Sequence, residues 1–399
     1  MRNLRERLMA VSSKPSQPRP AKPTREGAFF CREHIFPIEE LRGVEKTTLD
    51  EVRACDPLFT GETWDIRRLL FIDTETTGLS GGTGTVAFEI GVGFIDERGM
   101  VIRQYVMRDY GEEGAMLSEI ASLFERFDTV VTFNGKSFDL PLLESRMIMQ
   151  RIRTKVTAYP HFDLLHACRR VYKLRLGRCN LSALEAAVLG QTREDDLPGA
   201  LVPERYFSYL KTGEFALLED VLRHNLQDVK SLAELTGHLC TVFRRPLELA
   251  HPEDIYGVGR TLMRGGHTEQ ARRCFKILGK SSLSPQAHMH LAASYKKGRE
   301  WDDEISTCRT MIAAGEGGTW PYIELAKYYE HIAKDIPAAL RCANGALAYF
   351  LNTAPLHGEN ECERAHLMRR IDRLKRKLLI QQEKERTDQT NQAKEETTP

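Results

Sequence analysis

The stretch Leu69-Leu70-Phe71-Ile72-Asp73-Thr74-Glu75-Thr76-Thr77-Gly78-Leu79 decides the fold prediction for this chain. Four consecutive apolar residues predict a short buried strand, and an acid-x-acid pair follows where that strand should end. Side chains two positions apart in an extended chain point to the same face, so Asp73 and Glu75 direct their carboxylates toward one point. Two carboxylates held so close repel each other unless a hard cation lies between them. The alternative is a plain turn, because acidic residues often follow strands without binding anything.

Composition places the chain among soluble globular proteins. Its 399 residues are enough for two or three domains, each with its own core. They are 41% hydrophobic and 28% charged, as in soluble globular proteins. We expect no membrane association, because no apolar run approaches the ~20 residues that cross a bilayer and no signal peptide is recognisable. The nine cysteines are scattered without a C-x-x-C pair, which predicts reduced thiols in a cytoplasm. Net charge is only +1, so contact with nucleic acid would depend on local basic clusters.

The segments after the first strand follow the order of a mixed α/β sheet. Residues Val86–Ile95 and Val101–Met107 are predicted strands, and their short connections favour an antiparallel meander. Glu113–Phe127 has helical periodicity, and Thr129–Phe133 is a fourth predicted strand. Glu89 lies on the second of these strands and either faces the acidic strand end or has a surface or cross-strand role.

A second acidic motif, Phe133-Asn134-Gly135-Lys136-Ser137-Phe138-Asp139-Leu140, follows the fourth strand. Asp139 begins a predicted helix, where a carboxylate can simply cap free backbone N–H groups. The amide of Asn134 can hydrogen-bond a sugar or a base, and the ring of Phe138 offers a stacking surface.

A third motif, Leu222-Arg223-His224-Asn225-Leu226-Gln227-Asp228, lies in a segment of helical periodicity. His224 and Asp228 are therefore one turn apart on one helix face. This pair suits a metal-binding carboxylate beside a proton acceptor, and an ordinary surface pair is the alternative. Asp195-Asp196-Leu197-Pro198-Gly199, just before this helix, has the composition of a surface loop, although two adjacent acids also permit a metal-binding interpretation.

The three motifs, in this order, resemble those of the DEDD-type 3′–5′ exonucleases, which have a ribonuclease H-like fold. The layout of residues 66–245 is similar to that of the bacterial YprB-like group of predicted exonucleases. The resemblance implies metal-binding roles for Asp73, Glu75, Asp139 and Asp228. It also implies contacts with the terminal nucleotide, made by Thr76, Leu79, Asn134 and Phe138. One position departs from the family, which has Tyr four residues or His five residues before the last aspartate: here His224 stands at the tyrosine spacing and Arg223 at the histidine spacing.

The resemblance implies metal-dependent hydrolysis at the 3′ end of single-stranded DNA or RNA. Two divalent ions, Mg²⁺ or Mn²⁺, roughly 4 Å apart would stabilise the attacking and leaving oxygens, with Asp73 bridging them. His224 would orient or deprotonate the attacking water. Two alternatives stay open, namely a catalytically inactive scaffold of the same fold and an endonuclease. Nothing in the sequence identifies a group that reads the 2′-OH, so the choice between DNA and RNA is open.

A basic helix is predicted between the second and third motifs. Apolar residues keep helical spacing from Leu164 to Leu174, which leaves Arg169, Arg170 and Lys173 on the outer face. Because this face is almost purely basic, we expect it to contact a nucleic-acid backbone, and a solvated helix surface is the alternative.

Residues 246–380 follow a different pattern, in which small and aromatic residues recur at intervals of about 33 and 34 positions. This spacing is similar to that of tetratricopeptide helix pairs. The three sets are Gly259, Leu262, Ala271 and Phe275, then Ala292, Tyr295, Glu304 and Cys308, then Ala326, Tyr329, Ala338 and Cys342. Such a stack of helices would bury a continuous core and offer a surface to a protein partner, and a plain helical bundle is the alternative.

The remaining segments carry weaker signals. Residues 1–27 are predicted to be a disordered basic arm and residues 381–399 a disordered polar tail, because both lack apolar periodicity. Residues 28–65 are expected to lead into the domain formed by residues 66–245.

Overall fold

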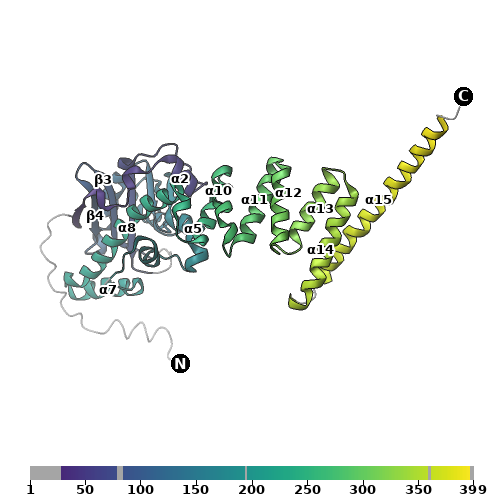
Figure 1. The fold of residues 1–399 in the computed structure, drawn as a ribbon. Coiled ribbons are helices and arrows are strands. Elements are labelled where there is room, and N and C mark those ends of the chain that lie inside the picture. Colours follow the sequence, from purple (N-terminus) through teal and green to yellow (C-terminus); the bar gives the residue numbers. More distant parts are fainter. Residues whose placement is uncertain (1–27, 79–83, 194–195, 358–360, 396–399) are drawn as a thin grey trace, which may run out of the picture. The chain divides into compact units, whose positions relative to one another are not determined.

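The computed structural model describes residues 28–78, 84–193, 196–357 and 361–395. The chain divides into two compact units, Met1–Pro246 and Leu247–Pro399. The first unit combines one sheet with helices, and the described part of the second is helical (Figure 1). This confirms the predicted fold class, an α/β domain followed by an all-α domain. The predicted arm 1–27 and Leu79 lie outside the described residues.

The sheet of the first unit is mixed. Its strands are β1 (Phe30–Phe36), β2 (Leu69–Thr76), β3 (Ala87–Asp96), β4 (Gly99–Val106), β5 (Thr129–Thr132) and β6 (His161–Asp163). Their order in space is β1-β4-β3-β2-β5-β6. β2, β3 and β4 form the predicted antiparallel meander, whereas β5 and β6 run parallel to β2. The acidic strand β2 therefore lies inside the sheet, with β3 on one side and β5 on the other.

The segment 28–65, expected only to lead into the domain, contributes an edge strand and a helix. β1 pairs antiparallel with β4, from Phe30 opposite Val106 to Phe36 opposite Met100. Its half-buried positions include Arg32 and its exposed positions include Ile35, so its hydrophobicity does not alternate as a strand pattern requires. That inversion explains why the strand could not be recognised from the sequence.

Helices cover both faces of the sheet. In the first unit they are α2 (Leu49–Cys55), α3 (Glu113–Phe124), α4 (Asp139–Met149), α5 (Leu164–Leu176), α6 (Leu181–Leu184), α7 (Val202–Thr212) and α8 (Glu219–Arg244). Leu70 and Ile72 share a core with α3, α4 and α7, whereas α8 crosses β2, β3 and β4 on the other face. α5 and α2 pack against α8.

Two glycines of β3 let α8 approach the sheet closely. A Cβ at Gly91 would lie 2.1 Å from Asn225 Oδ1, and a Cβ at Gly93 would lie 2.8 Å from Val229 Cγ1. Either side chain would push α8 away, because real Cβ contacts are not that short. The residues of α8 can therefore reach the end of β2.

The second unit is a series of helices in which each packs against the next. These helices are α9 (Pro252–Arg264), α10 (Thr268–Ile277), α11 (Ser284–Gly298), α12 (Trp301–Ala313), α13 (Trp320–His331), α14 (Ile336–His357) and α15 (Glu361–Glu395). A Cβ at Gly259 would lie 2.9 Å from the ring of Phe275, so the glycine permits close packing of α9 on α10. The tetratricopeptide character of these helices stays a prediction.

The segment 381–399, predicted to be disordered, is helical as far as Glu395, because α15 continues through it. Its Gln, Glu and Lys residues are good helix formers, and a solvated helix needs no apolar stripe once a packed helix precedes it. Among the helices of the described ranges, none has the length and apolar character that crossing a bilayer requires.

Candidate active site

The acids at the end of β2 face helix α8. Asn225 of α8 donates a hydrogen bond from Nδ2 to Asp73 Oδ2 at 2.9 Å. Glu75 Oε1 lies 3.9 Å from His224 Nε2, also on α8. The two carboxylates therefore lie on the same side of the sheet, as their spacing predicts.

Thr74, between these two acids, points to the opposite face and meets the second motif. Its hydroxyl donates to Asp139 Oδ1 at 2.5 Å, and Asp139 is buried. Asp139 is the first helical residue of α4 rather than its N-cap, which is Phe138. Its carboxylate is therefore tied to β2 across the sheet end. Burial is the main cause that raises the pKa of Asp139, to about 6.

The third motif completes the cluster from α8. His224 Nε2 lies 3.6 Å from Asp228 Oδ2, one turn along the helix. Glu75, His224 and Asp228 each offer one ligand atom, and these atoms lie within 4.8 Å of one another. The three side chains are only 13–15% exposed. Carboxylate oxygens with one imidazole nitrogen form a donor set that can hold a divalent ion.

The electrostatics of the cluster favour a cation. Burial raises the pKa of Asp73 well above the ordinary carboxyl value, and the neighbouring charges of Asp228, Glu75 and Asp139 raise it further. Burial likewise raises the pKa of Glu75, and among the neighbouring charges that of Glu89 raises it most. Each carboxylate thus disfavours the ionised form of its neighbours. A bound divalent cation would remove this repulsion.

A network of buried polar side chains from α8, β4 and β3 holds Asp73 in place. Asn225 is fully buried, and its Oδ1 lies 3.3 Å from Nε2 of Gln104. Gln104 also donates to Glu89 Oε1 at 2.9 Å. Glu89 pairs with Glu75 in the β2–β3 register and is buried on the α8 side, which resolves the orientation that the sequence left open. Asn225 could not have been recognised beforehand, because a helical pattern alone does not reveal which polar residue is buried.

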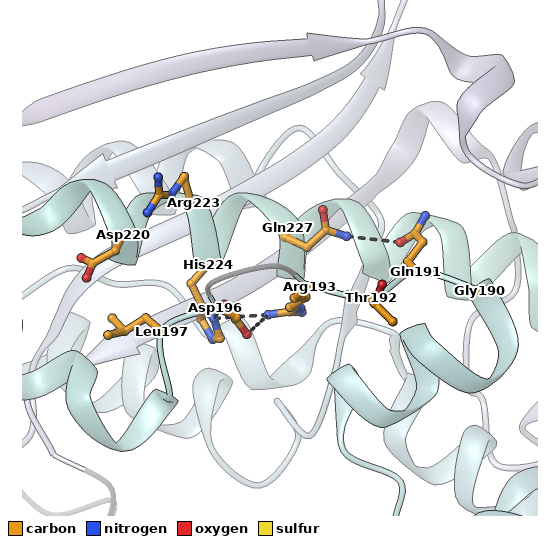
Figure 2. Close-up of a pocket in the computed structure, with 10 residues that line it drawn as sticks. All are labelled: Gly190, Gln191, Thr192, Arg193, Asp196, Leu197, Asp220, Arg223, His224 and Gln227. Atoms are coloured by element: carbon orange, nitrogen blue, oxygen red, sulfur yellow. Dashed lines mark hydrogen bonds and ion pairs between the residues drawn. The ribbon is translucent and has the colours of Figure 1, made fainter.

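The loop before α7 brings further residues to the cluster that sequence reasoning did not assign to it. Arg193 donates to Glu185 from Nε at 2.6 Å and from Nη2 at 2.7 Å, and Nη2 also hydrogen-bonds Asp228 Oδ1. Asp196 Oδ1 lies 2.7 Å from His224 Nδ1, so the loop interpretation of this acid was incomplete. Figure 2 shows Arg193, Asp196 and His224 converging beside a pocket of about 520 Å³. Its lining residues are Gly190, Gln191, Thr192, Arg193, Asp196, Leu197, Asp220, Arg223, His224 and Gln227.

The residues expected to contact the terminal nucleotide have different surroundings. Thr76 is buried and its hydroxyl donates to the Gly78 carbonyl at 2.7 Å. Asn134 is exposed with a left-handed φ of 69°, and Phe138 is half-buried. Asp163, the N-cap of α5, holds this turn by accepting the backbone N–H of Asn134 at 2.8 Å.

The predicted basic face of α5 is only partly available. Arg170 donates to the Cys55 carbonyl at 3.1 Å and to Asp56 Oδ1 at 3.0 Å, so its guanidinium fastens α5 to the end of α2. These contacts occupy part of the guanidinium of Arg170, and its contact with nucleic acid stays a prediction. Arg169 and Lys173 are exposed, and Lys173 also hydrogen-bonds the Gly177 carbonyl.

A mixed sheet with acids at the end of an inner strand, and a further acid on a helix that crosses it, defines the ribonuclease H-like class. Residues 70–240 match the family model described as the RNase H superfamily. Over 367 residues the chain is 32% identical to the uncharacterized protein YprB of Bacillus subtilis (strain 168). This alignment covers 87% of this chain and 86% of that protein. The chain belongs to the family of YprB, and its residues 70–240 match the RNase H superfamily.

A more distant similarity is to the family B DNA polymerase from the hyperthermophilic archaeon Pyrobaculum calidifontis. It covers 52% of this chain and 30% of that chain, with 16% identity and a TM-score of 0.32. The chain thus spans less than a third of the polymerase, and a likeness at this level carries no functional conclusion.

Proposed function

We propose that this protein is a metal-dependent 3′–5′ exonuclease that hydrolyses single-stranded nucleic acid with two divalent ions. The observation that supports it most is the convergence of acids from three separate elements at one end of β2. Asp73 and Glu75 come from β2, Asp139 from α4 and Asp228 from α8. Burial and mutual repulsion raise the pKa of Asp73 and Glu75, a cost that a structural role alone would not require.

Each residue has a role in this proposal. Asp73, Glu75, Asp139 and Asp228 would hold Mg²⁺ or Mn²⁺, which suit a site dominated by oxygen ligands. When bound, such ions stabilise charge on the attacking and leaving oxygens of the phosphodiester. His224 Nε2 faces the carboxylates and would orient the attacking water or accept its proton.

The nucleic-acid strand would lie along the surface beside this cluster. The turn that carries Asn134 and Phe138 immediately precedes Asp139, and both side chains would contact the terminal nucleotide. Thr76 and Leu79 follow the acids of β2 in sequence and would contact the same nucleotide. Arg169 and Lys173 of α5 would contact backbone phosphates.

A second candidate is a catalytically inactive member of the superfamily that binds a protein partner through its helical unit. The observation in its favour is a separate unit of consecutively packed helices, an arrangement that presents an extended surface. This candidate predicts no hydrolysis under any metal condition.

The decisive experiment follows the degradation of single-stranded DNA and RNA labelled at the 3′ or the 5′ end, with Mg²⁺, with Mn²⁺ and with a chelator. We expect a ladder that shortens from the 3′ end, depends on metal and is absent in Asp73→Asn. Asp50→Asn is the matched control, since it makes the same chemical change at an exposed position at the start of α2.

Three other results would contradict the proposal. Cleavage of circular single strands would indicate an endonuclease. Equal activity of Asp73→Asn and wild type would exclude the metal assignment. Absence of cleavage with either polymer and either metal would favour the inactive scaffold.

A further inference from the structure

We infer that Asp196 is a positioning residue that holds the imidazole of His224 by its Nδ1–H and leaves Nε2 unprotonated toward Glu75 and Asp228. This deepens the proposed function and rests on it for its catalytic meaning. The inference starts from the 2.7 Å contact between Asp196 Oδ1 and His224 Nδ1.

The chemistry of the two partners assigns the proton. An ionised carboxylate only accepts hydrogen bonds, so a 2.7 Å contact is attractive only if Nδ1 carries hydrogen. In neutral imidazole the other nitrogen, Nε2, then has a free lone pair. That nitrogen lies 3.6 Å from Asp228 Oδ2 and 3.9 Å from Glu75 Oε1, at the acidic end of β2.

Arg193 also holds Asp196 in place. Its Nη1 lies 3.2 Å from Asp196 Oδ2 and also 3.2 Å from His224 Nδ1. The guanidinium cannot donate to an Nδ1 that already carries hydrogen, so the contact with the carboxylate is the favourable one of the two.

Arg193 itself is anchored from behind. Glu185, which is fully buried in the π-helical turn Glu185–Leu189, receives two of its N–H groups. Ser231 of α8 donates a further hydrogen bond to Glu185. A planar guanidinium bound by two parallel hydrogen bonds has little freedom. Arg193 therefore connects Asp196 to Asp228, and these two carboxylates lie on either side of the His224 ring.

This arrangement determines what His224 can do. With Nε2 unprotonated, the ring can accept a proton from water or bind a divalent ion at the nitrogen that faces Glu75 and Asp228, whereas in the opposite tautomer only Nδ1 could do so. Arg193 contacts Oδ1 of Asp228, whereas Oδ2 of Asp228 faces His224. Asp228 can therefore keep its contact with Arg193 while Oδ2 remains available to the site.

The test measures the His224 tautomer in metal-free protein, where no catalytic step is needed. The full-length chain is labelled with ¹⁵N-histidine, and two-bond ¹H–¹⁵N correlations are recorded at about pH 8.5, two units above the ordinary imidazole pKa of about 6.5. His224→Gln identifies the signal among the twelve histidines. We expect the Nδ1–H tautomer in wild type and a shift toward Nε2–H in Asp196→Asn, because an amide can donate to Nδ1.

Two further variants make the result specific. Asp196→Glu keeps a carboxylate and should restore the Nδ1–H tautomer at least in part. Asp220→Asn changes another acid that lines the same pocket but pairs with Arg205 at 2.9 Å, and it should leave the His224 signal unchanged. An Nε2–H tautomer in wild type, or the same tautomer in wild type and Asp196→Asn, would overturn the inference.

Kinetics then separate positioning from binding. Loss of a residue that orients a catalytic histidine typically lowers activity by about 10–100-fold. We expect a fall of this size in kcat for Asp196→Asn with KM nearly unchanged, and an unchanged kcat would overturn the positioning role. If wild type shows the inferred tautomer response but cleaves nothing, the proposed function fails while the assignment of the ring stands.

Discussion

Buried carboxylates have opposite surroundings in the two units of this protein. In the sheet unit, Asp73 and Glu75 are buried beside other acids, and both burial and like charges raise their pKa. In the helical unit, burial alone would raise the pKa of Glu324 and Glu330, but hydrogen bonds from lysine and arginine outweigh it and lower the pKa of both. The charges that act most on Asp73 and Glu75 are those of other acids, whereas Glu324 and Glu330 lie beside cations of their own unit.

The helical unit uses these pairs to join neighbouring helices. Glu330 of α13 accepts from Arg373 Nη2 at 2.6 Å and from Lys377 Nζ at 2.8 Å, both on α15. Glu324 accepts from Lys327 at 2.5 Å and from Lys296 of α11. Acids that are neutralised within the chain hold helices together, whereas acids that are not neutralised leave a place for an external cation.

Glu304 is intermediate between the two cases. It occupies a position where the predicted tetratricopeptide repeat would favour a small residue, and among the described residues its Oε2 is a buried atom without a hydrogen-bond partner. Burial raises the pKa of Glu304, and Lys296 at 4.0 Å opposes that rise. Buried acids of the helical unit are thus tolerated in proportion to the cations that reach them.

The largest effect should come from removing one charge of the sheet cluster. Asp139→Asn keeps an acceptor for the Thr74 hydroxyl but removes a metal-binding carboxylate, so we expect kcat to fall at least ~10³-fold. The free energy of unfolding without metal should stay equal or rise, because one buried like charge disappears. Single-turnover cleavage and urea unfolding measure the two quantities. Retained activity, or a clear loss of stability, would show that the cluster is structural.

Divalent metal should stabilise only the sheet unit. At a metal concentration about 100 times its Kd, binding adds about 2.7 kcal/mol to the stability of the unit that holds it. Hydrogen exchange followed by mass spectrometry reports the two units separately, and we expect slower exchange in β2, α4 and α8 but not in α9–α15. Asp73→Asn should remove the protection. Equal protection of both units would contradict the assignment of the metal to the acidic cluster.

Removing a paired acid of the helical unit should lower the stability of that unit and leave cleavage activity unchanged. Glu330→Gln leaves the cations of α15 without their buried partner, and we expect a loss of about 1–2 kcal/mol in the stability of that unit. The value is below that of a fully buried pair, because Arg373 and Lys377 are 45% and 47% exposed. Glu383→Gln, at an exposed position of α15, is the control and should change stability little. Cleavage activity should not depend on either variant.

The smallest expected effect is the pH dependence of the difference in stability between wild type and Glu330→Gln. The folded pKa of Glu330 is lowered, so its ion pairs contribute stability above the ordinary carboxyl value of 4.5 and lose it as pH falls through the lower folded pKa. Wild type should therefore exceed Glu330→Gln in stability at about pH 7 and approach it as pH falls below the lowered folded pKa of Glu330, where the side chain becomes neutral. Unfolding of both proteins across this range tests the sign. A constant difference would mean that Glu330 acts through packing rather than charge.

Local patterns predicted much of the sheet and part of the site. The apolar run before Asp73, the meander of β3 and β4, and the helical spacing of His224 and Asp228 all depend on residues close together in sequence. β1 was missed because Arg32 is half-buried and Ile35 exposed on an edge strand, the reverse of a normal alternation. The intramolecular partner of Arg170 could not be foreseen, because Asp56 comes from a segment more than a hundred residues earlier.

By itself, the sequence determined strands β2 to β5 and the helices that carry the second and third acidic motifs, because periodicities of two and of 3.6 residues are local properties of the chain. It also determined that His224 and Asp228 share a helix face. Only the tertiary structure decided that Asn225 holds Asp73, that Arg193 bridges Glu185 and Asp228, and that Asp196 contacts His224. These contacts join segments distant in sequence, and they depend on the close approach of α8 to β3 that Gly91 and Gly93 permit.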